Sequence, residues 1–186
     1  MLIAKPAARK DRSHVLRAPS TYDISEGEAK LGQMVLSRRD DTGLITLGER
    51  SCTIGRARPE ENGAWRALVA LAHGRVPEKA PPNPFLLRDA AGATVAAAAP
   101  ARKAVAVSHA GREYRFKQIG FFNTGWGLYP PEGDRPLGTV AKKSAFSFTI
   151  LIDLPAELDP AVQVFLFWMR LQRELESARN SPTTTT

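Results

Sequence analysis

Hydrophobic and polar residues alternate with a period of two along most of this chain. The clearest run extends from Phe146 to Ile152, where a large apolar side chain occupies every second position. Tyr114 and Phe116 alternate with basic residues in the same way. Such alternation is typical of β-strands that bury one face of a sheet and expose the other. The pattern therefore predicts a mainly β protein.

Turn signals that contain glycine separate the alternating segments. Several of them lie about twenty residues apart, a spacing that corresponds to one hairpin with strands of roughly seven to ten residues. The clearest are Glu26-Gly27, Gly48-Glu49, Ala91-Gly92, Ala110-Gly111 and Glu132-Gly133. This regular spacing predicts an antiparallel meander.

A weak internal repeat runs through the same segments. In each copy an apolar strand and a polar turn with glycine lead to an apolar residue, a small residue and a second strand. The apolar and small residues are Leu31-Gly32, Val95-Ala96 and Leu137-Gly138. A small residue at a fixed place in a strand indicates a close backbone approach or a bend, as at the corner of a barrel.

The C-terminal part of the chain departs from the β pattern and predicts a helix over residues 159–179. Asp159 is suited to cap its start, and Pro160 is tolerated in the first turn. Nine of the eleven residues from Ala161 to Leu171 are apolar, so this half of the helix has no polar face. Such a helix is either enclosed by protein or inserted in lipid. Eleven residues extend only about 16 Å, roughly half the hydrocarbon thickness of a bilayer, which favours enclosure.

The size of the remaining chain predicts what encloses the helix. About 146 residues are left without the helix and the two ends, enough for roughly a dozen strands with their turns. A closed barrel of about 12 strands leaves an axial gap of about 12 Å, close to the diameter of a helix with its side chains. We therefore expect one domain over residues 14–179, a closed antiparallel barrel around a central hydrophobic C-terminal α-helix. Residues 1–13 are expected to form a flexible basic N-terminal arm, and residues 180–186 a disordered tail.

The balance of charges favours an anionic partner. The chain has 26 Lys and Arg residues against 19 Asp and Glu residues, a net charge of +7. Such a surface attracts phospholipid headgroups, nucleic acid or acidic proteins. Cys52 is the only cysteine, which excludes an intrachain disulfide and favours a cytoplasmic location. No apolar run is long enough for a membrane-spanning helix or a signal peptide.

Three adjacent basic pairs follow the small residues of the repeat by four to seven positions. They are Arg38-Arg39, Arg102-Lys103 and Lys142-Lys143. Equivalent positions in repeats lie at equivalent heights of a barrel, so we expect a positive collar near one rim. Each of these residues would attract an anionic membrane surface by about 1 kcal/mol. Alternatively, the pairs only keep the protein soluble and protect strand ends.

Three aromatic residues surround the turn at residues 123–125, namely Phe121, Phe122 and Trp126. If they are exposed, they are candidates for contact with the lipid interface or for stacking on unpaired bases. If they are buried, they close one end of the barrel around the helix. Both interpretations are open at this point.

The sequence contains no recognisable catalytic or metal-binding arrangement. His14, His73 and His109 are far apart, and none has a second ligand at helical or strand spacing. Cys52 has no histidine within local reach to activate it. A glycine-rich phosphate-binding loop is also missing. We therefore expect a protein that is not an enzyme and that needs neither a cofactor nor a metal.

The repeat segments, residues 85–103 and the ending from Phe148 to Pro160 with its apolar helix resemble the tubby-like β-barrel superfamily. The resemblance covers residues 14–179 and is closest to the small bacterial members of the LURP-one-related and phospholipid-scramblase-like branch. It implies a 12-stranded barrel around a central helix. Members of the superfamily include phosphoinositide-binding domains, lipid-scrambling candidates and plant defence-associated proteins. The acidic segment of calcium-dependent scramblases has only partial counterparts here, Asp153, Glu157 and Asp159, without EF-hand spacing.

The charge and the resemblance together predict a cytoplasmic, non-enzymatic module that binds anionic phospholipid headgroups at the inner face of a membrane. A structural scaffold that docks another protein without binding lipid is the alternative. Scramblase-like activity and nucleic-acid binding are further alternatives. Nucleic-acid binding ranks below the others, because the chain lacks helix-turn-helix spacing, zinc ligands and the aromatic signature of an RNA-recognition motif.

Overall fold

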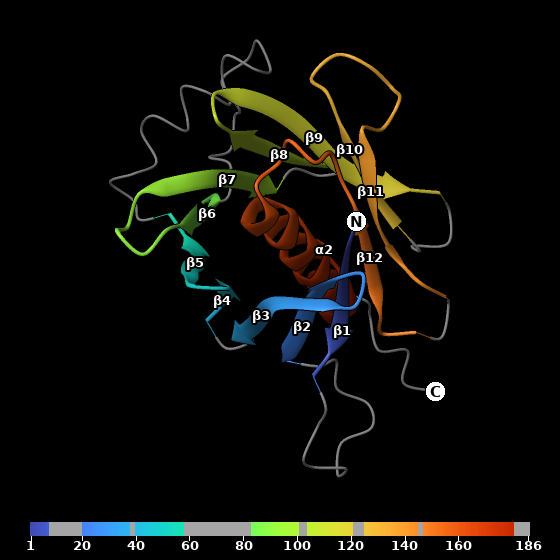
Figure 1. Ribbon diagram of the computed structural model, residues 1–186. Coiled ribbons are helices and arrows are strands. Elements are labelled where there is room, and N and C mark those ends of the chain that lie inside the picture. Colours follow the sequence, from blue (N-terminus) through green and yellow to red (C-terminus); the bar gives the residue numbers. More distant parts are fainter. Residues whose placement is uncertain are drawn as a thin grey trace, which may run out of the picture.

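The computed structural model describes residues 1–7, 20–37, 40–57, 83–100, 104–120, 125–144 and 147–180. These residues form a closed barrel of twelve antiparallel strands around the C-terminal helix α2, Pro160–Asn180 (Figure 1). Each strand pairs with its neighbours in the sequence, and β1 pairs with β12 to close the ring. The predicted fold class is therefore confirmed.

The strands have the following bounds. The first six are β1 (Leu2–Pro6), β2 (Thr21–Glu26), β3 (Ala29–Ser37), β4 (Thr42–Leu47), β5 (Arg50–Arg56) and β6 (Phe85–Arg88). The last six are β7 (Thr94–Pro100), β8 (Ala104–His109), β9 (Arg112–Ile119), β10 (Gly125–Tyr129), β11 (Gly138–Lys142) and β12 (Ile150–Asp153).

The prediction of a flexible arm over residues 1–13 is wrong for its first part. Leu2–Pro6 forms β1, which pairs with β2 on one side and with β12 on the other. Leu2 and Ala4 point into the core and are buried. Lys5 is exposed within this strand, and the other basic residues that suggested an arm begin only at Arg9, after the strand has ended. Residues 8–13 lie outside the described residues, as do residues 181–186 of the predicted tail, whose residue 180 is the last residue of α2.

Helix α2 starts where the sequence indicates. The Asp159 carboxylate accepts a hydrogen bond from the backbone N–H of Ala161 at 2.8 Å and so caps the helix. From Ala161 to Arg170 every residue is buried, because strands surround this part of the helix on all sides (Figure 1). The predicted enclosure is thereby confirmed, and it explains why this segment has no polar face.

Aromatic contacts join the enclosed helix to the inner wall of the barrel. Phe167 packs edge-on against Tyr22 of β2, with 5.0 Å between ring centroids. Trp168 packs edge-on against Phe85 of β6 at 4.9 Å. Such pairs contribute about 0.5–1.5 kcal/mol beyond the burial of their area. They connect the helix to strands on two sides of the ring.

Arg170 is a fully buried charge near the point where α2 leaves the barrel. Its Nη1 donates to the backbone oxygen of Val140 at 3.1 Å, and its Nε and Nη2 both donate to the Glu174 carboxylate at 3.0 Å. A buried guanidinium needs such partners to offset the loss of its hydration. The ion pair between Arg170 and Glu174, one turn apart in α2, therefore lies where the helix changes from apolar to polar residues.

The repeat seen in the sequence corresponds to a repeated backbone feature. The register of β2 with β3 shifts at Leu31, just before Gly32, and that of β6 with β7 shifts at Val95. A side chain at Gly32 would overlap the backbone oxygen of Thr46, and one at Gly138 would overlap the backbone oxygen of Asp153. The expected close backbone approach at the small residues is thus confirmed at two of the three copies.

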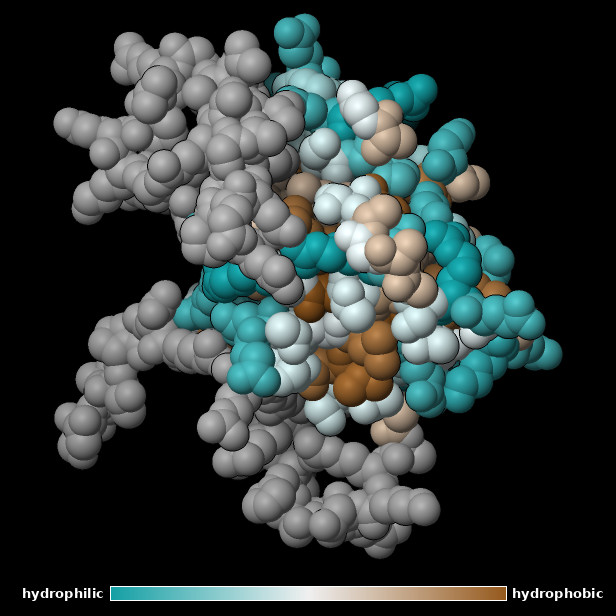
Figure 2. Space-filling model, turned by 90° about the vertical axis from the view of Figure 1, so that its left-hand side faces the viewer, coloured by the Kyte–Doolittle hydropathy of each residue, from teal (hydrophilic) through white to brown (hydrophobic). Residues whose placement is uncertain are grey.

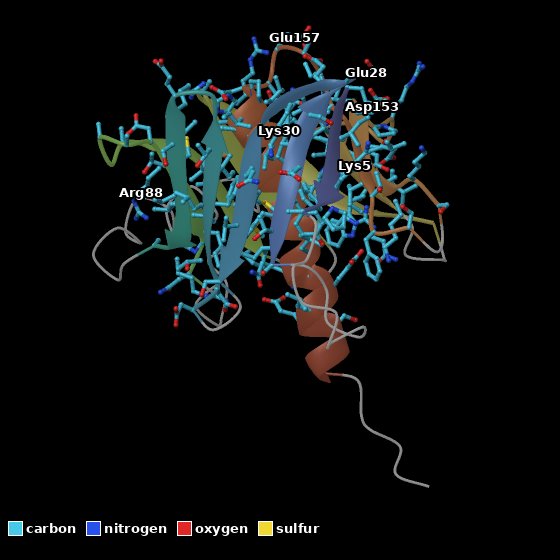
Figure 3. All side chains as sticks on the ribbon, turned by 60° about the horizontal axis from the view of Figure 1, so that its bottom comes forward. Lys5, Glu28, Lys30, Arg88, Asp153 and Glu157 are labelled. Atoms are coloured by element: carbon cyan, nitrogen blue, oxygen red, sulfur yellow. The ribbon has the colours of Figure 1, made fainter. Side chains whose placement is uncertain are left out.

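The meander sends successive connections to opposite ends of the barrel. We call the end at which α2 begins the start end; its connections are residues 27–28, 48–49, 89–93, 110–111, 130–137 and 154–159. We call the opposite end the exit end; its connections are residues 7–20, 38–41, 57–84, 101–103, 120–124 and 143–149. In Figure 3, Glu28 and Glu157 lie at the start end, and the second half of α2 extends beyond the strands at the exit end.

Asp159 joins the helix to the barrel wall, and this contact generates a prediction about stability. Its second carboxylate oxygen accepts from Arg50 at 2.9 Å, which raises the pKa of that guanidinium. Asp159→Asn keeps an oxygen for the cap and removes the charge. Because the pair is largely exposed, we expect a loss of about 0.5 kcal/mol in the free energy of unfolding.

Asp159→Ala removes the cap as well, and we expect a loss of about 1 to 2 kcal/mol. Urea denaturation of the two variants beside the unmodified chain measures both values. Equal losses in the two variants would contradict the assignment of Asp159 as the helix cap.

Candidate functional site

The two ends of the barrel carry opposite charge in the sequences of their connections. The start-end connections contain seven acidic residues and one basic residue, and the exit-end connections contain thirteen basic residues and six acidic ones. The net charges of the connections are therefore −6 at the start end and +7 at the exit end. Of the basic residues in the exit-end connections, only Lys143 lies within the described part of the chain, so a charge asymmetry along the barrel axis is a prediction from the sequence.

At the exit end, the hairpin between β11 and β12 combines basic and apolar side chains. Lys142 is partly buried at the end of β11, and Lys143 is exposed in the turn. Phe148, in the same turn, is 58 % exposed. The backbone N–H of Lys143 donates to the oxygen of Thr149 at 2.9 Å, which holds the two sides of the turn together. One short hairpin thus presents an aromatic ring and two lysines.

The exposure of Phe148 differs from the expectation of a strand with inward-facing residues from Phe146 to Ile152. Strand β12 begins only at Ile150, so the alternation of buried and exposed positions does not apply to Phe148. The N–H of Thr149 donates to the Ser147 hydroxyl at 3.0 Å, which stabilises a turn in place of strand pairing. Phe146 lies outside the described residues.

Four of the six predicted headgroup-binding residues, Arg38, Arg39, Arg102 and Lys103, lie outside the described residues. The described strands next to them, β3 and β7, run in the same direction as β11 and end at the exit end. These three strands are separated from each other by four positions around the ring. The positive collar stays a prediction, and its three basic pairs adjoin strand ends on the same rim.

Trp126 does not contact the surroundings of the protein. Its side chain is 5 % exposed and packs against Phe116, with 5.1 Å between ring centroids. It lies within β10, one residue after Gly125, and points inward like Leu128. The interpretation of Trp126 as a membrane contact is therefore wrong, and burial at the barrel interior is correct. Phe121 and Phe122 lie outside the described residues.

The outer wall carries a small apolar area between β3 and β4. Val35 and Leu44 are cross-strand partners, and they are 40 % and 41 % exposed. Figure 2 shows the side of the barrel wall with β4 to β6, where apolar residues lie among neutral and hydrophilic ones. A pair of exposed apolar residues is common on protein surfaces and does not by itself indicate a function.

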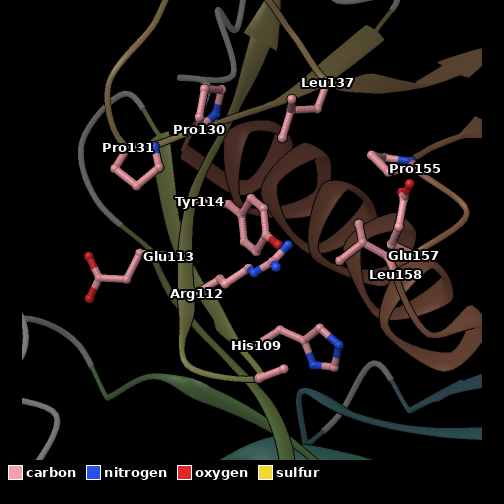
Figure 4. A pocket seen from close by; sticks show the side chains of 11 residues that line it. His109, Arg112, Glu113, Tyr114, Pro130, Pro131, Leu137, Pro155, Glu157 and Leu158 are labelled. Carbon is pink, nitrogen blue, oxygen red and sulfur yellow. The ribbon is translucent and has the colours of Figure 1, made fainter.

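A pocket of about 830 Å³ lies at the start end (Figure 4). It is formed where the β8–β9 turn, the β10–β11 connection and the β12–α2 connection meet. Its apolar lining consists of Tyr114, Pro130, Pro131, Leu137, Pro155 and Leu158. This pocket could not be predicted from the sequence. The three connections are far apart in the sequence, and only the closed register brings them together.

Four polar side chains, those of His109, Arg112, Glu113 and Glu157, complete the lining of the pocket. Nδ1 of His109 lies 2.9 Å from the backbone oxygen of Val95, so in the neutral ring it carries the proton and leaves Nε2 as an acceptor. Arg112 and Glu157 are exposed at the mouth of the pocket. In Figure 4, Glu113 of β9 points away from the other side chains. The pocket therefore offers both donors and acceptors beside a mainly apolar surface.

Contacts outside the pocket hold its walls in place. Arg115 donates to the backbone oxygens of Pro130 and Gly133, and Lys117 lies 3.8 Å from the Asp134 carboxylate. On the opposite side, Gln163 donates to the backbone oxygen of Leu158 at 3.0 Å. Both connections are thus fixed by strand or helix residues, so the pocket is formed without a ligand.

Among the described residues, no group of three or more His, Cys, Asp or Glu side chains is placed to hold a metal ion. The helix in the described part of the chain is not apolar over a length that would cross a membrane. Cys52 lies inside the barrel and is 2 % exposed. Burial raises the pKa of its thiol, and the nearby Arg50 opposes this effect only in part.

Comparison with protein-family models, with curated proteins and with solved structures found no match to this chain. The resemblance to the tubby-like superfamily therefore stays a prediction from the sequence.

The burial of Cys52 predicts a protected thiol. Because the raised pKa favours the neutral form, we expect reaction with a disulfide reagent at pH 8 to be at least about a hundredfold slower in the folded protein than in urea. Absorbance of the released thiolate measures both rates. Rapid and complete labelling of the folded protein would contradict the assignment of Cys52 to the core.

Proposed function

We propose that this chain is a non-enzymatic barrel of the tubby-like type that binds anionic membrane surfaces through its exit end. The observation that carries this proposal is the hairpin of Lys142, Lys143 and Phe148, at the end where basic residues outnumber acidic ones. An exposed aromatic ring beside two cations fits the interface between headgroups and acyl chains. In the cell this function belongs at the inner, cytoplasmic face of a membrane, where anionic lipids attract basic proteins.

The expected affinity is modest and depends on salt. Each Lys or Arg close to an anionic bilayer contributes about 1 kcal/mol, and the attraction decays within about 8–10 Å at physiological ionic strength. Two lysines and one phenylalanine give only weak binding, so the other basic residues of the exit-end connections have to contribute. This need for several contacts favours reversible, peripheral association.

The charge asymmetry supports one orientation of the barrel. The start end, with its net −6 connections, is repelled by an anionic surface, and the exit end is attracted. In this orientation the start-end pocket faces the solution.

A protein-interaction scaffold is the second candidate function, and the start-end pocket is the observation in its favour. The two functions use opposite ends of the barrel and do not exclude each other. Scramblase-like activity and nucleic-acid binding have no comparable feature among the described residues, and they are tested as outcomes of the same experiments.

A single charge reversal tests the lipid-binding proposal. Lys143→Glu changes an exposed residue of the exit-end hairpin, and we expect the partition coefficient on vesicles with anionic lipid to fall about tenfold. Flotation of the protein with vesicles of phosphatidylserine and phosphatidylcholine, at increasing salt, measures this coefficient. Phe148→Ser is expected to weaken binding as well, without changing its dependence on salt.

Arg135→Glu provides the matched control, because it makes the same change in net charge at an exposed residue of the start end. We expect this variant to bind vesicles like the unmodified chain. Equal losses for Lys143→Glu and Arg135→Glu would exclude docking through the exit end. Absence of binding at low salt would exclude the proposal as a whole, and a gel shift with single-stranded DNA at the same salt would then favour nucleic-acid binding.

A further inference from the structure

We infer that the start-end pocket binds a short extended peptide of a partner protein, in which an apolar side chain is flanked by basic residues. This inference does not depend on membrane binding, because the pocket and the exit-end hairpin lie at opposite ends of the barrel. Its occupant follows from three properties of the pocket: its apolar lining, its fixed walls and the charge around its mouth.

The shape and lining of the pocket suit an apolar side chain. Its volume of about 830 Å³ falls in the range of sites for ligands of a few residues. The floor is formed by Tyr114 of β9 and by Leu158, which is 4 % exposed. Leu137 is 47 % exposed at the edge and offers further apolar surface to a ligand. Rigid walls lower the entropic cost of binding, because little has to be ordered when the ligand enters.

The charge around the pocket favours a basic partner. The lining and the three connections that form the pocket together contain five acidic residues, Glu113, Glu132, Asp134, Glu157 and Asp159, against two arginines, Arg112 and Arg135. Of these acids, Glu132, Asp134 and Glu157 are exposed. Asp159 is engaged by Arg50, and Asp134 has only a 3.8 Å contact with Lys117 while its side chain is 96 % exposed. Glu157 lines the pocket, and the exposed Glu132 and Asp134 lie in the connection between the lining residues Pro131 and Leu137, so these carboxylates favour lysines or arginines beside a bound apolar residue.

The polar groups inside the pocket fit the backbone of a peptide. Arg112 supplies N–H donors for a peptide carbonyl, and Nε2 of neutral His109 accepts from a peptide N–H. Neither an apolar ligand nor a fully cationic one would use both groups. A peptide satisfies them with its main chain and leaves its side chains for the apolar lining and for the acidic mouth.

The test uses the full chain and a fluorescein-labelled hexapeptide with two central apolar residues, tryptophan and leucine, between two pairs of lysines. A peptide with glutamates in place of the lysines is the matched probe. Fluorescence anisotropy, at low and at physiological salt and without lipid, measures both dissociation constants. We expect the lysine peptide to bind at least about tenfold more tightly than the glutamate peptide.

Two variants localise the binding. Glu157→Lys is expected to weaken binding of the lysine peptide by about tenfold. Glu49→Lys makes the same charge change in an exposed start-end connection that does not line the pocket, and it is expected to change the affinity by less than about threefold. Leu137→Arg, at an exposed apolar position, is expected to weaken binding at high salt as well as at low salt.

Four outcomes would overturn the inference. Equal binding of the two peptides, or equal losses for Glu157→Lys and Glu49→Lys, would exclude a specific basic peptide. Preference for the glutamate peptide would assign the pocket to an anionic ligand held by Arg112. Light scattering could also show that the protein self-associates in competition with the peptide. If Phe148→Ser abolishes this self-association, the pocket would be assigned to the hairpin of a second copy of the chain. Because the assay contains no membrane, a failure of lipid binding leaves its result unaffected, and Lys143→Glu is expected to bind the peptide normally.

Discussion

The enclosure of an apolar helix by its own chain is the constraint on which the rest of this structure depends. From Ala161 to Arg170 every residue of the helix is buried, so the strands have to surround it. An open sheet would leave one side of Phe165, Phe167 or Trp168 in water. Burying one large apolar side chain contributes about 1.5–3 kcal/mol, and several such residues lie on every face of α2. The helix is therefore buried only if the ring closes. The short strand β1 is needed because it pairs with both β2 and β12 and so completes the ring.

The features that follow from local pattern were predictable, and those that follow from register were not. Alternation and turn spacing predicted the strands, and the all-apolar segment after Asp159 predicted the enclosed helix. Strand β1 was missed because five residues next to a basic segment are too short for a clear period. Phe148 was misplaced because periodicity does not locate the first paired residue of β12. The start-end pocket was beyond the sequence, since three connections from different parts of the chain meet there only after the ring has closed.

The separation of charge along the axis is a consequence of the meander. In a closed antiparallel barrel, successive connections alternate between the two ends, so connections of opposite net charge in the sequence are expected at opposite ends. The sequence analysis detected the basic pairs because they follow the small residues of the repeat. It did not detect that the intervening connections are acidic, although that information is present in residues such as Glu28, Glu49 and Asp89. The expected charge asymmetry follows from the order of acidic and basic connections along the chain, and not from the total net charge of +7.

The enclosed helix also explains why both proposed functional surfaces lie at the ends of the barrel. Its interior is filled by α2 and by inward-facing side chains, so the strands have no room for a ligand on the axis. On the outer wall, the exposed large apolar side chains of the described strands are those of the pair Val35 and Leu44, which offer little surface for binding. The connections are less constrained, because apart from residues such as Leu158 they contribute little to the core. At the start end, Arg115, Gln163 and the Asp159 cap of α2 hold the connections in place. A pocket can therefore be present there without any change in the packing of the core.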